Sequence, residues 1–532
     1  MNILIQGSGR SFEVHYSLCK VLLDEYPNAK FGYFSSSTQT MSLFKNSIKP
    51  LFQTYSPYNF DAKFDYESNI NLIREFENYS GKSIWKMIAA DRAIGWHDDL
   101  GNYGTYIEKC YRSDRKYLIN EVACSIREMS AMFNDFKPDI FIPAKAMGDV
   151  SVFILEALCI KSGVEYILPE YSRVSNLYRI SNCIMDLSPV ITNDFHTLMI
   201  SEEINSNKRG AKLFDEMTTN SKNIQSFDKD FMKTYNLAER NNIFNSYNLL
   251  KKFIYAISSD LFHFIKKCIK LIKKPSFKFS TIWHKFKLSL TLRSQKFSNS
   301  RVVLDKSFGE LPERQQKYLY FPLYNIPEYS SNFMSTMWVD IVSVIGILAK
   351  SVPIDWIIVV KEHPTSIVYN FREKNFYDKI SRIPNVIFAP VLSDSKQLIS
   401  NAELVFVTVG TSGWEAILNG VPVLSPVENF WDCMQLSRKS SDIESLHDDI
   451  KQAVTDNNKI NQAERRKRVA CFLEALIKNS FTISNPEVFA YYYQGTKEQY
   501  SLQGIELGRG IIKFLKKSNI DKSIGNKKFF CI

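Results

Sequence analysis

The sequence predicts an α/β fold with two Rossmann-like domains. The first observation is a set of short runs rich in β-branched and aromatic residues, such as YLYF, DWIIVV and LVFVTV, each ending at a small polar or charged cluster. Such runs are typical of buried parallel strands, which bind ligands at their carboxyl ends. The second observation is that runs of this kind occur in both halves of the chain, separated by segments with helical periodicity.

Length and composition divide the chain into four parts. Its 532 residues, 45% of them hydrophobic and 23% charged, are typical of a globular protein with more than one domain. We expect an acceptor domain at 1–235, a basic helical segment at 236–310, a nucleotide-sugar domain at 311–480, and a helix crossing back with a tail at 481–532. MNILIQG indicates a strand and not a signal peptide, and no apolar run is long enough to span a membrane. Nine scattered cysteines favour free thiols in a reducing compartment, so the prediction is a cytoplasmic protein.

The N-terminal half opens as strand, turn, helix and strand over residues 1–36. A helix predicted over residues 83–94 carries Asp91. Residues 138–176 read as a β-α-β unit whose second strand ends near Glu170. Asp91 and Glu170 are candidate carboxylates on the acceptor side. For Glu170 the alternative is a structural ion pair with an arginine.

The most informative stretch of the C-terminal half is GTSGWEA, which follows LVFVTV. Gly410 and Gly413 allow close approach of the backbone, and free N–H groups at a helix start bind anions. We expect Thr411 or Ser412 to cap the helix, with Glu415 completing a capping box. The alternative is a well-capped helix with no ligand.

The other two strand ends supply charged side chains. DWIIVV is followed by Lys361, Glu362, His363 and Pro364, and the proline favours an extended His363 that donates to a phosphate oxygen. YLYF runs into PLYNIPE, where Glu328 is the carboxylate expected to face the cleft. The alternatives are a structural histidine and an acid at a helix start.

Together these motifs resemble a known family. FPL-x-x-x-PE, KEHP and the GTSGWEA segment, within residues 317–431, are similar to capsule or surface polysaccharide biosynthesis proteins, regarded as glycosyltransferases of the two-domain GT-B type. The His-Pro pair is also similar to that of bacterial sialyl- and Kdo-transferases, which implies a CMP-sugar donor. One departure stands out: where the family commonly carries His and Gln in the first motif, this chain has Tyr324 and Ile326.

Nearly all of the net charge lies in one segment. Residues 251–296 contain 12 Lys or Arg and one Asp, an excess equal to the chain's net charge of +11. Apolar residues recur there at helical spacing, which is typical of an amphipathic helix pair at a membrane surface. We therefore predict peripheral association with the inner face of the cell membrane. The alternatives are a hairpin packed on the enzyme and an RNA-binding arm, although no nucleic-acid module is recognisable.

These observations lead to one expected function. The protein is predicted to be a metal-independent glycosyltransferase without a cofactor, transferring a sugar from a nucleotide-sugar to a glycan or lipid-linked acceptor. Lys361 and His363 stabilise the leaving phosphate, and Glu328, Glu170 or Asp91 is the base. A polyol-phosphate transferase of the teichoic-acid kind and a non-catalytic membrane scaffold remain alternatives. A nucleotide-sugar epimerase is disfavoured, because it has no use for the basic segment.

Overall fold

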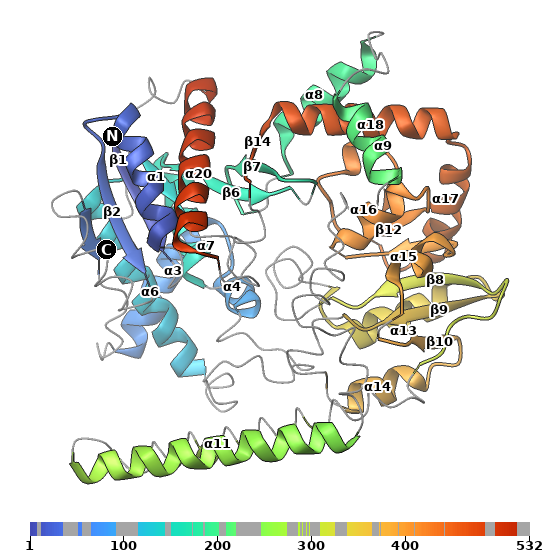
Figure 1. The fold of residues 1–532 in the computed structure, drawn as a ribbon, viewed down its shortest axis with the longest axis horizontal. Coiled ribbons are helices and arrows are strands. Elements are labelled where there is room, and N and C mark those ends of the chain that lie inside the picture. The colour runs from blue at the N-terminus through green and yellow to red at the C-terminus, as the bar shows by residue number, and fades with distance from the viewer. Residues whose placement is uncertain are drawn as a thin grey trace.

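The computed structural model describes most of the chain. The described residues are 1–7, 12–35, 52–55, 65–91, 115–143, 150–172, 174–184, 187–201, 209–219, 246–273, 283, 286, 287, 290, 294, 297, 309–324, 338–363, 372, 374–391, 393–408, 410–440, 442–484 and 495–518. Two α/β domains lie beside each other, one built around each half of the chain (Figure 1).

The N-terminal domain is a five-stranded parallel sheet with the order β3-β2-β1-β4-β5. Its strands are β1 (Asn2–Gly7), β2 (Lys30–Ser35), β3 (Phe52–Tyr55), β4 (Ile140–Ile142) and β5 (Glu165–Tyr166). The chain starts in the middle, moves to one edge, and returns to the other side of β1, which is the Rossmann order. The predicted β-α-β unit is confirmed, because β4 and β5 pair in parallel across a helix.

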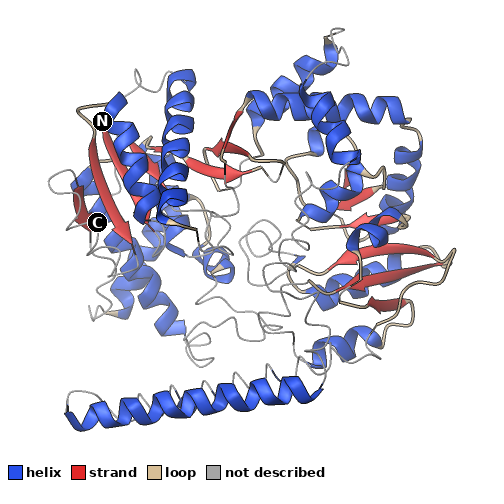
Figure 2. Cartoon of the chain, in the orientation of Figure 1, coloured by secondary structure: helices blue, strands red, loops and turns tan. Residues whose placement is uncertain are grey.

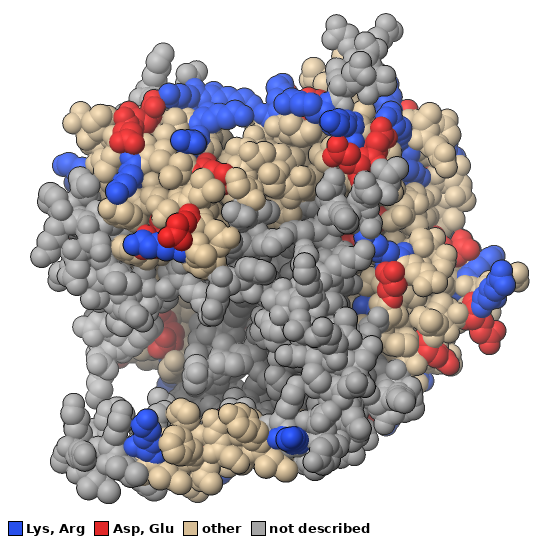
Figure 3. Space-filling view, in the orientation of Figure 1, with Lys and Arg blue, Asp and Glu red and all other residues tan. Residues whose placement is uncertain are grey.

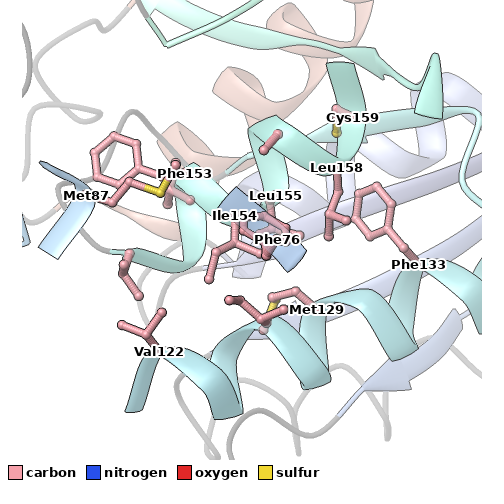
Figure 4. Close-up of a cluster of buried hydrophobic side chains, with 14 of the residues drawn as sticks. Phe76, Met87, Val122, Met129, Phe133, Phe153, Ile154, Leu155, Leu158 and Cys159 are labelled. Atoms are coloured by element: carbon pink, nitrogen blue, oxygen red, sulfur yellow. The ribbon is translucent and has the colours of Figure 1, made fainter. Parts of the chain in front are cut away.

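Helices cover both faces of this sheet. They are α1 (Phe12–Glu25), α3 (Tyr66–Ser80), α4 (Ile84–Ala90), α6 (Arg115–Phe136), α7 (Val150–Ser162) and α20 (Lys497–Ser518). Helices α3, α4, α6 and α7 share one apolar cluster with Leu4 of β1. Figure 4 shows α7 contributing Phe153, Ile154 and Leu158 to this cluster. The opposite face is covered by α1 and α20.

The C-terminal domain is a six-stranded parallel sheet with the order β10-β9-β8-β11-β12-β13. Its strands are β8 (Lys317–Pro322), β9 (Trp356–Lys361), β10 (Val386–Ala389), β11 (Leu404–Phe406), β12 (Val423–Ser425) and β13 (Ser437–Lys439). Numbered along the domain, this is the order 3-2-1-4-5-6 of a Rossmann fold. The predicted fold class, with a Rossmann-like sheet in each half, is therefore confirmed.

Two helical layers enclose the C-terminal sheet. One contains α13 (Ile341–Ser351), α14 (Lys374–Ser381) and α17 (Leu446–Asn458). The other contains α15 (Ser395–Ser400), α16 (Thr411–Leu418) and α18 (Gln462–Lys478), and a 3₁₀ turn, η5 (Asp432–Met434), follows β12. Asp340 caps α13 and Asn461 caps α18 through their side chains, so local sequence fixes where these helices begin.

Two helices from the first half of the chain belong to the second domain's core. α8 (Pro189–Ile200) and α9 (Arg209–Thr219) bury Ile191, Phe195 and Met217 with residues of α18. Ion pairs reinforce this contact: Arg466 binds Asp215 at 2.7 Å and Arg209 binds Glu474 at 2.8 Å. This packing differs from the assignment of residues 1–235 to the acceptor domain, because partners far along the chain hold these helices.

A small sheet and one helix join the two halves. β6 (Leu168–Tyr171), β7 (Leu177–Ser181) and β14 (Ser480–Thr482) form an antiparallel sheet of order β14-β7-β6, which lies between the large sheets in Figure 2. After β14 the chain reaches α20, which packs so closely on α1 that a Cβ at Gly504 would lie 2.1 Å from the carbonyl oxygen of Val14. The last described helix thus lies on the first domain.

The basic segment is a separate helix, α11 (Ser246–Lys273), which Figure 1 shows apart from both sheets. Residues 283, 286, 287, 290, 294 and 297 are also helical, and their spacing places them on one helix face. None of the described helices is long and apolar enough to cross a bilayer.

Candidate functional site

The candidate site lies at the carboxyl edge of the C-terminal sheet. The chain runs from β8 outward to β10, and then returns to β11 on the other side of β8. Such a reversal of strand order opens a crevice where ligands bind in parallel α/β sheets. Because neighbouring strands are about 4.8 Å apart, the ends of β9, β8 and β11 lie within about 10 Å of one another. Groups from three motifs therefore share one edge.

The first group is the amino end of α16. The helix begins at Thr411 with Gly410 as its N-cap residue, and no side chain in the described structure caps it. The predicted caps by Thr411 or Ser412, and the capping box with Glu415, are therefore wrong. The helix starts too early for them, and Glu415 lies buried beyond its first turn. The N–H groups of this turn are left for another acceptor, which suits an anion.

The two glycines of this turn have different roles. Gly410 has φ +141, a conformation that L side chains rarely adopt, and a Cβ added there would meet no atom within 4 Å. A Cβ on Gly413 would lie 2.9 Å from the Val407 side chain and 3.1 Å from Trp431. Gly410 thus leaves room for a ligand, whereas Gly413 packs inward and does not allow the ligand approach expected of it.

A buried hydroxyl lies just before Gly410. Thr408 is 1% exposed, and its Oγ1 has no hydrogen-bond partner among the described residues. On the next strand, Ser425 Oγ donates to the Val427 carbonyl at 2.9 Å and accepts from Asn429 Nδ2 at 3.0 Å. A buried polar group without a partner calls for an explanation. A ligand oxygen bound at the start of α16 would give the Thr408 hydroxyl a hydrogen-bond partner.

The second group comes from the end of β9. Lys361 is 3% exposed and follows Val359 by two residues, so its side chain lies on the sheet face covered by α15, α16 and α18. His363 is partly exposed. Pro364 lies outside the described residues. The Leu323 N–H donates to the Lys361 carbonyl at 2.9 Å, which ties the end of β8 to that of β9.

A buried network around Glu362 fixes this edge, and it was missed by the sequence analysis. The Glu362 carboxylate accepts from Arg372 Nε at 3.2 Å and from the Tyr377 hydroxyl at 2.7 Å, and its other oxygen accepts from the His363 N–H at 2.8 Å. Burial raises the pKa of Tyr377 well above its usual value, helped by the charge of Glu362. Arg372 also donates to the Tyr324 carbonyl at 2.6 Å. One arginine thus positions the ends of two strands.

Tyr324, at the position where the resembled proteins commonly have histidine, has a structural role. It is 9% exposed, and its hydroxyl donates to the Trp338 carbonyl. Its ring packs in the cluster that contains Phe321 and Phe406. The side chain at this position therefore belongs to the domain core in this chain.

Two of the predicted carboxylates, Asp91 and Glu170, lie away from this edge, in the N-terminal domain and in the small antiparallel sheet. Asp91 is 4% exposed, and its Oδ2 accepts the Val150 N–H at 2.7 Å at the start of α7. Glu170 pairs with Arg179 at 2.6 Å and accepts from Ser181 at 2.8 Å within the small antiparallel sheet, not at the end of a parallel strand. Glu328 lies outside the described residues. The described contacts of Asp91 and Glu170 are thus structural.

Comparisons with known proteins give fold-level likenesses only. No family model matches the chain, and no curated protein matches it. Among solved structures, a UDP-GlcNAc 2-epimerase from Neisseria meningitidis is similar at 13% identity and TM-score 0.26, covering 97% of this chain and 100% of that one. The glycosyltransferase VinC in complex with dTDP is similar at 10% identity and TM-score 0.22, covering 90% and 96%. Likenesses at this level carry no activity over to this chain.

Proposed function

We propose that the protein is a GT-B-type glycosyltransferase of capsule or surface polysaccharide biosynthesis, with a CMP-sugar as its favoured donor. The observation that carries the proposal is the start of α16, which no described side chain caps, beside the Thr408 hydroxyl, which has no hydrogen-bond partner among the described residues. The sheet order β9-β8-β11 supports the proposal, because Lys361 and His363 come at the end of β9 and the start of α16 follows β11. The motif resemblance supplies the reaction class, and this constellation suits a nucleotide phosphate.

The chemistry is charge stabilisation at a leaving group. As the bond between the sugar and the donor phosphate breaks, negative charge grows on the phosphate oxygens. The α16 N–H groups, His363 and Lys361 stabilise that charge, which lowers the barrier without a metal ion. Glu328 is the proposed base that deprotonates the acceptor hydroxyl. The acceptor is a glycan or a lipid-linked glycan.

The proposal is tested by measuring which donor the protein uses and how replacing His363 changes the transfer. We expect radiolabelled sugar to be transferred from a CMP-sugar to a lipid-linked acceptor, and His363→Ala to reduce that transfer at least a hundredfold while leaving the unfolding temperature unchanged. The matched control is His196→Ala, an exposed histidine on α8. Full activity in His363→Ala would remove the central assignment.

The same assay separates the alternatives. Transfer from CDP-glycerol in place of a CMP-sugar would identify a polyol-phosphate transferase. Failure to bind CMP, CDP or UDP in calorimetry would identify a non-catalytic scaffold, which has no need of a nucleotide.

The proposal includes a peripheral location on the inner, anionic face of the membrane. It is supported by the charge excess of residues 251–296 and by the separate position of α11. At about 1 kcal/mol per basic residue near an anionic leaflet, half of this excess suffices to hold the protein there.

A further inference from the structure

The two sides of α11 differ in what they contact. One side carries Phe253 and Phe264, whose rings stack on Phe297 at 4.7 Å and on Phe286 at 4.5 Å. Since the earlier residue of α11 meets the later residue of the partner segment, the two helical stretches run antiparallel. Trp283 also lies against Phe264, at 5.8 Å. This side of α11 is therefore used within a helical hairpin.

The other side of α11 is apolar and open to solvent. Its large apolar residues keep much of their surface exposed: Ile254 54%, Tyr255 77%, Leu261 45%, Phe262 64% and Ile265 48%. At 100° per residue these five side chains fall within an arc of about 120°, turned away from the Phe253 and Phe264 side. We call these five residues the apolar face. Figure 3 shows largely uncharged surface over α11 between basic side chains.

The charge around the apolar face selects its partner. Lys251 and Lys266 are exposed: helical spacing puts Lys266 beside one edge of the apolar face, and Lys251 on the same side of the helix one turn before Ile254 and Tyr255. Asp260, the one acidic residue of the segment, lies toward the hairpin side of the helix. An apolar strip bordered by ammonium groups matches the boundary between acyl chains and anionic headgroups, where lysines reach the phosphates along their apolar stems.

The geometry points to an in-plane lipid-binding element: we propose that the apolar face of α11 inserts into an anionic phospholipid leaflet, with the helix parallel to the membrane. This inference rests on the proposed membrane location and names the side chains that achieve it. The helix is about 42 Å long, and its apolar face enters about 5–10 Å into the leaflet. The hairpin partner stays on the protein side.

The test compares vesicle binding by the full chain and by a variant of the apolar face. The vesicles contain phosphatidylcholine alone, or equal parts of phosphatidylcholine and phosphatidylserine. Leu261→Ser, Phe262→Ser and Ile265→Ser together should weaken sedimentation with the mixed vesicles more than tenfold. The matched control is Ile200→Ser with Ile354→Ser, which removes apolar residues that are 83% and 104% exposed on α8 and before β9. The control should bind as the wild type does.

Two further measurements identify the contact. Lys251→Glu with Lys266→Glu should also weaken binding, and added salt should reduce the difference from wild type. In Phe262→Trp, tryptophan emission should shift to the blue on binding and be quenched by brominated lipid. CMP binding by calorimetry should be the same in all variants, so loss of nucleotide binding and loss of membrane binding are told apart.

Four results would overturn the inference. The first is undiminished vesicle binding by the serine variant, and the second is equal binding to neutral vesicles. The third is a wild-type protein that is a dimer in solution while the serine variant is a monomer, which would assign the apolar face to a second copy of the chain. RNA binding that depends on the same three residues would also overturn it.

Discussion

Helices α7 and α16 occupy the same place in the two domains, but their amino ends differ in whether a side chain binds them. Each follows the fourth strand of its sheet, just past the point where strand order reverses. In α7 the Asp91 carboxylate binds the first described N–H, whereas no described side chain caps α16. One domain thus provides its own anion, and the other leaves the position open. The comparison teaches that fold alone does not make a binding site.

The largest expected effect comes from removing the Glu362 carboxylate, whose contacts hold the strand ends near the start of α16, which no described side chain caps. Glu362→Ala leaves Arg372 buried and without its carboxylate, which typically costs about 3–5 kcal/mol. We expect a lower unfolding free energy in urea and loss of nucleotide binding. Asp355→Ala, which breaks an exposed pair with Lys317, should cost under about 1 kcal/mol. Equal losses in the two variants would contradict a framing role for Glu362.

Acid should weaken the N-terminal domain selectively. Burial lowers the pKa of His15 on α1 from 6.5 to about 4. The unfolded chain therefore binds a proton that the folded domain excludes, and stability is lost as the pH falls from 6.5 to 4, by about 3 kcal/mol. The hydrogen-exchange protection factors of amides in β1 should fall over this range, and those in β9 should fall much less. His15→Gln should remove most of the difference, and an unchanged pH profile in that variant would refute it.

The next test removes the side chain that binds the amino end of α7. Asp91→Ala removes the acceptor of the Val150 N–H and should cost about 1.5–3 kcal/mol. Phosphate should restore part of the lost unfolding temperature relative to chloride at equal ionic strength, because α7 then resembles α16. If phosphate raises the unfolding temperature of the variant no more than that of wild type, the equivalence of the two helix ends is wrong.

The smallest expected effect comes from a substitution that concerns only the start of α16, which no described side chain caps. Thr408→Val keeps the shape and removes a buried hydroxyl that has no described partner. The unfolding temperature should stay equal or rise, while nucleotide affinity should fall about tenfold. Thr197→Val on α8 is the control. Unchanged affinity in Thr408→Val would show that this hydroxyl does not meet the ligand.

The features that could be predicted from the sequence are those that leave a local pattern in it. Periodicity identified the strands that end at Lys361 and at GTSG, and it identified the β-α-β unit, because burial on both faces of a parallel sheet leaves a readable signal. The role of Asp91 depends on Val150, 59 positions away, and Arg372 reaches Tyr324 across 48 positions. Nothing in the sequence around Asp91 or Arg372 indicates these contacts. The start of α16 was missed by one or two residues, enough to turn a capped helix into an open one.

The position of α20 has a consequence for how the chain folds during synthesis. The core of the first domain includes Leu507, Ile511 and Leu515, which leave the ribosome after the whole second domain. Until then α1 exposes the apolar surface that α20 later covers. The domain made first is therefore completed last, and this interval is when a nascent chain is most exposed to chaperones and to aggregation.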